Sequence, residues 1–367
     1  MKRLLAAMLV LFVCAAPAAQ AGDVRLLRTL YADRGQTVVS PVSLNLALAM
    51  AAEGAKGETR AQLLAAAGLT EEGLADFVQK ALALQASGVS MASAAFVKAG
   101  LNVLPGYDAL LKDRYQAERF ALGDDVNAEV NAWVKEKTGG LIDSLLDQPP
   151  DPNLQMMLVN ALALTADWAG SFAAEDTYSQ TFHAPDGDVD ADFMHREAYM
   201  PYVELAGLRA VRLSYDGSAL GLTIVLPDGD LMDALDAIAA LSPNWDASTD
   251  ALSKVALALP KLSAKDSLSL ADTLKAMGVT EAFSDAADFS GIDGEKDLMI
   301  GSVLQKTRLD IDEEGTTAAA ASSVGMIAKA APMEEPSVEF TVDRPYILLL
   351  TDSETGLTLF AAAIEKP

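Results

Sequence analysis

Apolar residues are grouped along this 367-residue chain in runs whose lengths predict strands. The run 156–165 is apolar except for one interior polar residue, Asn160, as expected of a strand buried on both faces. Residues 299–311 predict a second long strand. Near the C-terminus, the apolar runs 346–351 and 357–364 flank a Ser-Glu-Thr-Gly sequence, which is typical of a hairpin turn.

Helical segments alternate with these strands. Residues 23–32 predict a short amphipathic helix, and 71–84 and 125–137 predict two more. Ser40 is a good N-cap and Pro41 suits the first helical position, so another helix is expected to begin there. No linker rich in Pro, Gly or Ser and no internal repeat divides the chain, which predicts a single α+β domain.

The segment that follows residue 311 fits neither pattern. From Gly315 to Ala328 it contains no charge and no proline, whereas surface loops of this length are usually polar. Four consecutive alanines favour a helix, but the flanking Thr, Ser and Val residues oppose a long one. With a period of two, the set from Thr316 to Ala328 is small or apolar throughout. The segment could therefore exist as an exposed loop and also as a central strand.

The N-terminus has the composition of a secretory signal. Lys2 and Arg3 precede an apolar run that ends in Ala-Gln-Ala, a small-residue cleavage site, and this run is short for a membrane span. We predict cleavage after Ala21. Residues 1–21 would be removed, and 22–367 would form one domain exported to the extracellular space or the periplasm.

Composition restricts the chemistry and the partners. The only cysteine, Cys14, lies in the predicted signal, so the mature chain is expected to have no disulfide. Without Lys2 and Arg3, 25 basic residues remain against 52 acidic ones, a net charge of −27. Such acidity disfavours nucleic acids and anionic membranes. No polybasic run is present that could bind a heparin-like cofactor.

Four motifs occur in order along the chain. They are Ser40-Pro41-Val42-Ser43 with the following Gly54-Ala55-Lys56-Gly57-Glu58-Thr59, Val159-Asn160-Ala161 with Trp168, Glu313-Glu314-Gly315-Thr316-Thr317-Ala318-Ala319-Ala320-Ala321, and Phe340-Thr341-Val342-Asp343-Arg344-Pro345. Together they resemble the serpin family over essentially the whole mature chain. The resemblance implies the α+β serpin fold: three mixed or antiparallel sheets, about eight to nine helices, and an exposed reactive-centre loop at about 313–337.

The resemblance also implies roles for single residues. The hinge of the loop would comprise Glu313, Glu314, Gly315, Thr316, Thr317, Ala318, Ala319, Ala320 and Ala321. Ser40, Ser43 and Asn160 would lie in the shutter under the central sheet, and Trp168 in the breach, where the loop first enters. Gln305 stands where many members carry a shutter histidine. The simpler interpretations are an N-cap for Ser40, a satisfied core amide for Asn160 and a core aromatic for Trp168.

In the family the scissile bond follows about sixteen residues after the hinge glutamate. Counting from Glu313 places this bond between Lys329 and Ala330, and a lysine there would fill the acidic pocket of a trypsin-like protease. Three alternatives stay open. Ala330-Ala331 would suit an elastase-like enzyme, Met326-Ile327 a chymotrypsin- or subtilisin-like one, and Met333-Glu334 a longer loop. A papain-like target is a further possibility.

The implied activity is irreversible suicide inhibition of a serine protease by a monomer without a cofactor, not catalysis. After cleavage, residues 315–328 would enter the sheet as a strand of about 46 Å and trap the acyl-enzyme. A non-inhibitory serpin that acts as a binding or chaperone-like protein is the main alternative. A secreted hydrolase is disfavoured, because the chain has only His183 and His195 and no nucleophile motif.

Overall fold

A computed structural model describes residues 17–123, 125–148, 151, 154–241, 252–316 and 336–367, and for 17–21 the backbone alone. Nine α-helices occur in these ranges: α1 (Pro17–Arg34), α2 (Pro41–Gly54), α3 (Gly57–Ala66), α4 (Leu74–Ala83), α5 (Pro105–Tyr115), α6 (Val126–Lys137), α7 (Leu231–Ala239), α8 (Ala271–Ala276) and α9 (Ser290–Asp293). Three short 3₁₀ helices accompany them: η1 (Leu84–Ser87), η2 (Ala174–Asp176) and η3 (Glu281–Phe283).

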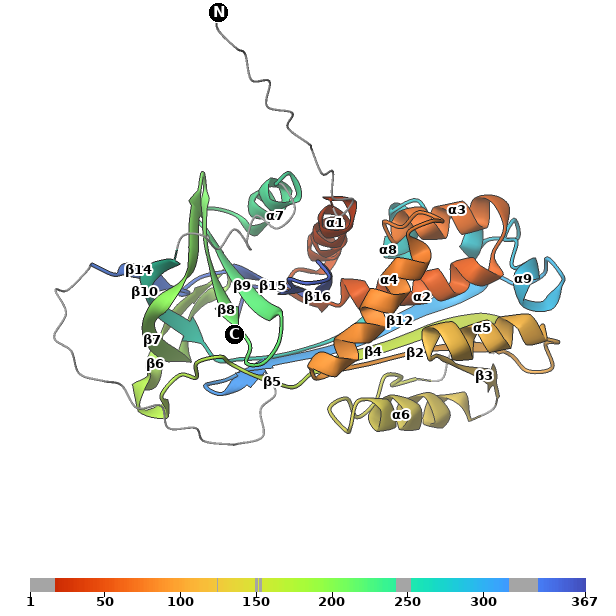
Figure 1. Cartoon of the computed structure of the whole chain (residues 1–367), viewed down its shortest axis with the longest axis horizontal. Helices are drawn as coiled ribbons and strands as arrows, with labels where there is room; N and C mark the ends of the chain where they lie inside the picture. The colour runs from red at the N-terminus through yellow and green to blue at the C-terminus, as the bar shows by residue number, and fades with distance from the viewer. Residues whose placement is uncertain (1–16, 124, 149–150, 152–153, 242–251, 317–335) are drawn as a thin grey trace, which may run out of the picture.

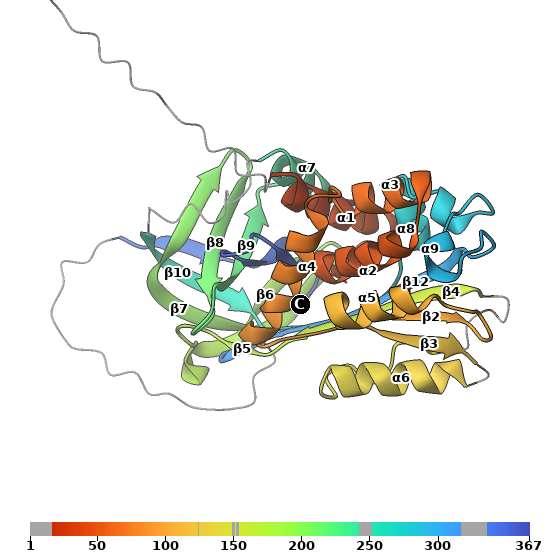
Figure 2. The ribbon, with the colours of Figure 1, turned by 45° about the vertical axis from the view of Figure 1, so that its right-hand side comes forward.

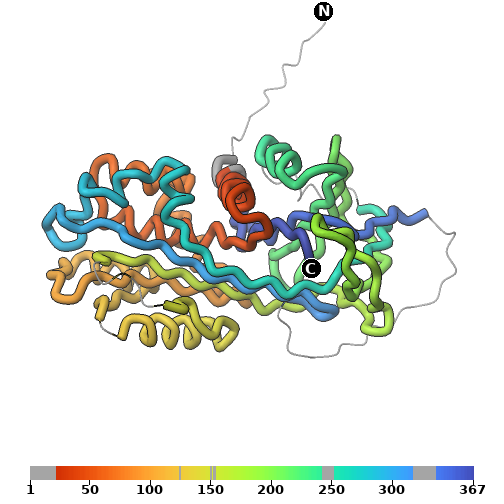
Figure 3. Tube along the Cα trace, turned by 180° about the vertical axis from the view of Figure 1, so that it is seen from behind, coloured from red at the N-terminus to blue at the C-terminus, as the bar shows by residue number. Residues whose placement is uncertain are grey.

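A central mixed sheet runs along the long axis of the molecule (Figure 1). Its strand order is β3-β2-β4-β12-β13-β5, with β11 paired to β12. The strands are β2 (Val89–Lys98), β3 (Glu118–Leu122), β4 (Met156–Leu164), β5 (Ala166–Asp167), β11 (Leu262–Ser269), β12 (Ile300–Ile311) and β13 (Gly315–Thr316). β12 and β4 pair in parallel at the centre, and Figure 3 shows both running across the molecule from behind.

The other strands form two sets that share one long strand, β7 (Gly187–Leu205). One set has the order β1-β16-β15-β9-β8-β7, and the other joins β7 to β6, β10 and β14. Their strands are β1 (Thr37–Val39), β6 (Thr177–Ala184), β8 (Leu208–Ser214), β9 (Leu220–Pro227), β10 (Leu252–Pro260), β14 (Val338–Thr341), β15 (Tyr346–Asp352) and β16 (Thr358–Ile364).

Helices cover both faces of the central sheet. In Figures 1 and 2, α2 lies over one face and α6 over the other. The alternation of side chains along β4 explains both contacts, because successive residues of a strand point to opposite faces. Met157 and Val159 pack with Trp133 of α6, whereas Leu158 and Leu162 belong to the core that contains α2.

The predicted elements agree with this arrangement. The strands expected at 156–165, 299–311, 346–351 and 357–364 are present within a residue or two, and the α+β class with three strand sets is confirmed. Helix α1 is longer than the predicted 23–32 and begins at Pro17. Proline and alanine suit the first turn of a helix, so helical backbone extends to the N-terminal side of Ala21. Cleavage after Ala21 stays a prediction.

Candidate functional site

The chain reverses direction directly after β12. The Asp312 carboxylate accepts hydrogen bonds from the backbone nitrogens of Glu314 (3.0 Å) and Gly315 (3.1 Å). The Asp312 backbone nitrogen donates to the Gly315 carbonyl (3.0 Å). Aspartate side chains commonly close turns in this way. The turn folds residues 315–316 back against β12 as the two-residue strand β13.

Strand β13 lies between β12 and β5. Thr316 is opposite Ile311 on one side and Ala166 on the other. A Cβ atom on Gly315 would lie 2.1 Å from the Ala166 carbonyl oxygen, so only glycine fits between the strands. Thr316 is 0% exposed, and its hydroxyl lies 2.6 Å from the Tyr215 hydroxyl. The start of the predicted hinge is therefore already a buried part of the sheet.

Trp168 holds the turn from the side of β5. Its backbone nitrogen donates to the Glu314 carbonyl (2.8 Å), and its indole Nε1 donates to the Asp312 carbonyl (3.0 Å). The indole stacks on Tyr215 with ring centroids 4.5 Å apart. Trp168 is thus a buried aromatic, and it also bonds directly to the segment that precedes the loop.

An ion pair fixes the outer side of the same turn. Lys261 Nζ lies 2.8 Å from the Glu313 carboxylate, and the Phe172 backbone nitrogen donates to the Glu313 carbonyl (2.8 Å). Burial by itself would raise the pKa of the Glu313 carboxyl. Hydrogen bonds, with Lys261 foremost, outweigh that cost and hold the pKa below its ordinary value.

A second cluster lies six residues further along the sheet, beneath α2. Gln305 of β12 binds the backbone of Ser40 twice: it accepts from the Ser40 nitrogen (2.8 Å) and donates to the Ser40 carbonyl (2.9 Å). Ser40 also caps α2, because its hydroxyl accepts from the Ser43 backbone nitrogen (3.4 Å). All three side chains are 0% exposed.

Asn160 of β4 faces Gln305 across the central pair of strands. Its carbonyl oxygen accepts hydrogen bonds from the hydroxyls of Ser43 (3.4 Å) and Ser93 (3.1 Å). Its amide nitrogen is buried and has no hydrogen-bond partner among the described residues. An unpaired buried donor costs free energy, so a partner supplied to this nitrogen would stabilise the sheet.

Comparison with known proteins decides the family. The sequence profile described as Serpin (serine protease inhibitor) matches residues 20–367. The chain belongs to the serpin family. The predicted fold is therefore confirmed together with the family.

Two relatives show how similar this chain is in sequence to other serpins. An uncharacterized serpin-like protein of Thermococcus kodakarensis is 33% identical over 356 residues, which cover 93% of this serpin and 83% of the relative. The leukocyte elastase inhibitor of Bos taurus is 31% identical over 371 residues, which cover 94% and 97%. Named relatives of this serpin thus include protease inhibitors.

Solved structures of other proteins have the same fold. Serpin48 of the insect Tenebrio molitor has a TM-score of 0.86 and 27% identity, over 97% of this serpin and 99% of that chain. Human thyroxine-binding globulin, complexed with thyroxine, has a TM-score of 0.84 over 96% of this serpin and 98% of that chain. Its identity is 24%, so that likeness concerns the fold alone. The same fold therefore also occurs in a protein that binds a small molecule.

The structure gathers the predicted shutter residues Ser40, Ser43, Asn160 and Gln305 in one cluster and places Trp168 beside Glu313–Thr316. Thr317, Ala318, Ala319, Ala320, Ala321, Lys329 and Ala330 lie outside the described residues.

Sequence reasoning did not single out three contributors to this site: Ser93, Tyr215 and Lys261. Ser93 had a usable signal, since it is a polar residue within the buried part of β2, but its partner depends on the register of β2 with β4. Tyr215 and Lys261 carry no local signal, because each contacts the predicted hinge, at Thr316 and Glu313, from a distant part of the chain.

The histidines do not form a hydrolytic site in the described part of the serpin. His183 pairs with Asp188 at 2.8 Å, and this hydrogen bond raises the pKa of the exposed imidazole. His195 contacts Gln180 and the Asp176 carbonyl, and neither histidine bonds a hydroxyl group of the described residues. The described residues contain no group of three or more His, Cys, Asp or Glu side chains that could hold a metal.

Proposed function

We propose that this serpin is an irreversible inhibitor of trypsin-like serine proteases that attack the bond between Lys329 and Ala330. The observation that carries this proposal is strand β13. Gly315 and Thr316 are already inserted between β12 and β5, so the strand that would trap an enzyme has its first two residues in place.

The register of the sheet supports continued insertion. Ile311 and Ala166 flank Thr316, and Gln305 and Asn160, each six residues earlier on its strand, face each other directly. Strand β12 and the chain formed by β4 and β5 therefore keep the same register from β13 to the shutter residues. A strand that continues from Thr316 would meet both neighbours in antiparallel register, with no slip needed.

This alignment predicts which loop residue would reach the shutter. Six positions after Thr316 is Ser322, which would lie between Gln305 and Asn160 and face the same side as Thr316. The Asn160 amide nitrogen, unpaired among the described residues, would then find a hydroxyl acceptor. Insertion would therefore relieve a buried unsatisfied donor at the centre of the sheet.

Insertion of the strand would release enough free energy to distort the active site of the trapped protease. Before insertion, β4 and β12 share one ladder of backbone hydrogen bonds. The inserted strand would pair with both of them, so the sheet gains about one ladder of hydrogen bonds. For the twelve residues from Thr317 to Ala328, at about 1 kcal/mol per bond, the gain is on the order of 10 kcal/mol. That equals the stability of a typical domain. A displacement of about 1 Å at the protease site already costs about a hundredfold in rate.

Target class rests on Lys329, whose ammonium group would bind the acidic specificity pocket of a trypsin-like enzyme. A non-inhibitory role as a binding protein is the second candidate, since the fold also occurs in thyroxine-binding globulin. The structure favours inhibition at one point: the hinge residue Thr316 is small, uncharged and already buried.

The test is to mix the purified serpin with trypsin and separate the products on a denaturing gel. A band near the summed masses is expected, together with a released C-terminal peptide that begins at Ala330. A cleaved serpin without this band, whose melting temperature does not rise on cleavage, would contradict inhibition and insertion together.

We also propose that residues 1–21 act as an export signal. The basic start, the apolar run and the Ala-Gln-Ala sequence support this. In the described part of the chain, no helix is long and apolar enough to cross a membrane. Mass spectrometry of protein recovered from the periplasm and the medium is expected to find a chain that starts at Gly22. An intact Met1 in those fractions would contradict it.

A further inference from the structure

An ionisable side chain is buried next to the proposed cleavage site. Asp23, the second residue of the proposed mature chain, is 6% exposed. Its carboxylate accepts a hydrogen bond from the Asn45 amide of α2, at the long distance of 3.5 Å. Burial raises the pKa of this carboxyl to about 7, although contacts with Thr358 and Asn45 lower it. With residues 17–21 attached, the fold therefore disfavours the charged form of Asp23.

Asp23 has no cationic partner in the part of the chain that the structure describes. Arg25, the nearest cation in the sequence, is exposed and lies two positions along the helix, which places it on another face. The other cations on α1 and on the elements around it contact other residues: Arg28 contacts Asp236, Arg34 contacts Asp266, and Lys275 contacts Asp272. The remaining charged groups of α1 and α7 are the acids Asp33, Asp230 and Asp233. On α2, Glu53 contacts Arg114, and after β16 Glu365 contacts Tyr31. A cation placed beside Asp23 would therefore favour its charged form directly.

The apolar contacts that hold α1 begin directly after Asp23. The helix packs against α7 and β16 (Figure 1). Four of its apolar side chains are at most 3% exposed and belong to the main core: Val24, Leu26, Leu27 and Leu30. Removal of residues 1–21 leaves all four in the chain. The mature helix is therefore expected to stay in place, with Asp23 still beside α2.

We infer that removal of residues 1–21 supplies the positive partner that Asp23 lacks and so converts this buried acid into a stabilising carboxylate. Cleavage leaves Gly22 as the first residue, with a free α-ammonium group one residue from Asp23. A Cβ atom on Gly22 would meet no atom within 4 Å, so the ammonium has room to turn toward the carboxylate. Side chains on a helix point toward its N-terminus, which directs Asp23 toward the new group. The inference rests on the proposed export signal.

Cleavage also changes the position of Asp23 within α1. The helix begins at Pro17, so Asp23 lies in its second turn while residues 17–21 are attached. Once the chain begins at Gly22, Asp23 lies in the first turn, where backbone N–H groups have lost the carbonyls four residues earlier. A carboxylate is favoured at this positive end of a helix. The helix end and the α-ammonium therefore stabilise the charged form of Asp23 together, and removal of the signal strengthens the fold near neutral pH.

The experiment compares three chains, each made with a defined first residue: the full chain from Met1, a chain from Pro17 and the mature chain from Gly22. The chain from Pro17 also has a free terminal ammonium, but five residues earlier, about 7.5 Å further along the helix. Each chain is made with Asp23 and with Asp23→Asn, and Asp33→Asn is the matched control, since Asp33 is an exposed acid on the same helix. Carbon-13 NMR of the carboxyl measures the pKa of Asp23, and thermal melts from pH 3 to pH 8 measure stability.

The substitution is expected to act in opposite directions in the long and the mature chains. In the chains from Met1 and Pro17, the pKa of about 7 exceeds the ordinary value of about 3.9, so the stability from Asp23 is complete below about pH 4 and is lost as pH rises through 7. Asp23→Asn is then expected to gain about 2–5 °C in melting temperature relative to the wild type between pH 5 and pH 8.

In the chain from Gly22, the pKa of Asp23 is expected to fall below about 3.9. Its contribution is then complete above about pH 4, is lost as pH falls through the folded pKa, and weakens above about pH 8 as the α-ammonium titrates. Asp23→Asn is therefore expected to lower the melting temperature of this chain by about 2–5 °C at about pH 6. Asp33→Asn is expected to change it by less than about 1 °C in all three chains.

A pKa of Asp23 that stays near 7 in the chain from Gly22 would overturn the inference. So would an ordinary pKa together with a melting temperature that Asp23→Asn leaves unchanged, because the carboxylate would then be hydrated and unpaired. Failure of the proposed export signal has a different signature: protein recovered from the periplasm and the medium would keep Met1, whereas the three chains made with defined starts would still differ as expected.

Discussion

Replacing Thr316 with arginine tests the insertion step at its first residue. Thr316 is fully buried between Ile311 and Ala166, and its hydroxyl lies 2.6 Å from that of Tyr215. An arginine at this position has two outcomes. Its guanidinium is buried beside Tyr215, or β13 leaves the sheet and the hinge stays outside.

Both outcomes are costly. Burial of an unpaired charge costs several kcal/mol. Withdrawal of β13 breaks its ladder bonds to both neighbouring strands and leaves the Tyr215 hydroxyl without its partner, which at about 1 kcal/mol for each lost bond amounts to about 3 kcal/mol. A barrier raised by about 3 kcal/mol slows insertion about a hundredfold. Hydrolysis of the acyl-enzyme would then precede insertion, and Thr316→Arg would be a substrate.

The assay titrates trypsin with each variant and compares the covalent band with the cleaved band on denaturing gels. Thr316→Ser keeps the hydroxyl and is expected to inhibit like the wild type. Thr316→Val keeps the shape but loses the bond to Tyr215, so a modest rise in the moles of serpin needed per mole of trypsin is expected. Unchanged stoichiometry for Thr316→Arg would refute the argument that β13 begins the inserted strand.

Four further predictions concern other parts of the chain. Lys329→Ala is expected to slow the reaction with trypsin and speed that with elastase; an unaltered trypsin rate would place the bond elsewhere. Ser322→Ala is expected to destabilise the cleaved form by about 1 kcal/mol in guanidinium unfolding, since Asn160 Nδ2 loses its acceptor, while the uncleaved form stays unchanged. The buried Tyr346 hydroxyl has no partner among the described residues, so Tyr346→Phe is expected to raise the melting temperature by about 1–2 °C; a lower one would contradict this. Burial raises the pKa of Asp23 to about 7, so in chains that keep residues 17–21 its stabilising contribution is complete below about pH 4 and is lost as pH rises through 7. Asp23→Asn is therefore expected to gain stability relative to the wild type between pH 5 and pH 8 in thermal melts, and a constant difference would rule out this titration.

Local patterns in the sequence were sufficient for most of the elements. The run at 156–165 became β4 because its residues are buried on both faces, with Met157 against α6 and Leu158 toward α2. Ser40 and Pro41 start α2 as expected, since capping depends only on the adjacent backbone. The one clear difference, the start of α1 at Pro17, arose because alanine-rich sequence stays helical beyond the amphipathic stretch.

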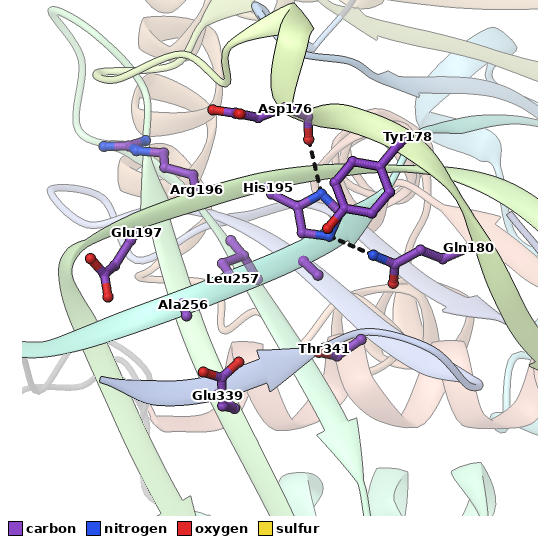
Figure 4. A pocket seen from close by; sticks show the side chains of 11 residues that line it. Asp176, Tyr178, Gln180, His195, Arg196, Glu197, Ala256, Leu257, Glu339 and Thr341 are labelled. Carbon is purple, nitrogen blue, oxygen red and sulfur yellow. Dashed lines mark hydrogen bonds between the residues drawn. The ribbon is translucent and has the colours of Figure 1, made fainter. Parts of the chain in front are cut away.

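Local patterns did not predict which residues contact each other when they lie far apart in the sequence. Gln305 binds the backbone of Ser40, and Tyr215 meets Thr316, although long stretches of chain separate the two members of each pair. The period of two predicts which face a side chain occupies, but it carries no information on which strand lies alongside or at what offset. The cavity of Figure 4 was equally hidden, because its lining residues, among them Tyr178 and Glu339, lie on strands that meet only through the pairing of β6, β7, β10 and β14.

The sequence by itself determined the hinge composition, the location of the strands and the motifs that resemble the serpin family, because these depend on residue type and near neighbours. Only the tertiary structure decided that Gly315 and Thr316 are already paired, that Asn160 keeps an unpaired amide nitrogen within the described chain, and that β4 and β12 share one register with β13. Strand pairing joins distant segments at a single offset, and that offset is set by packing of the whole core.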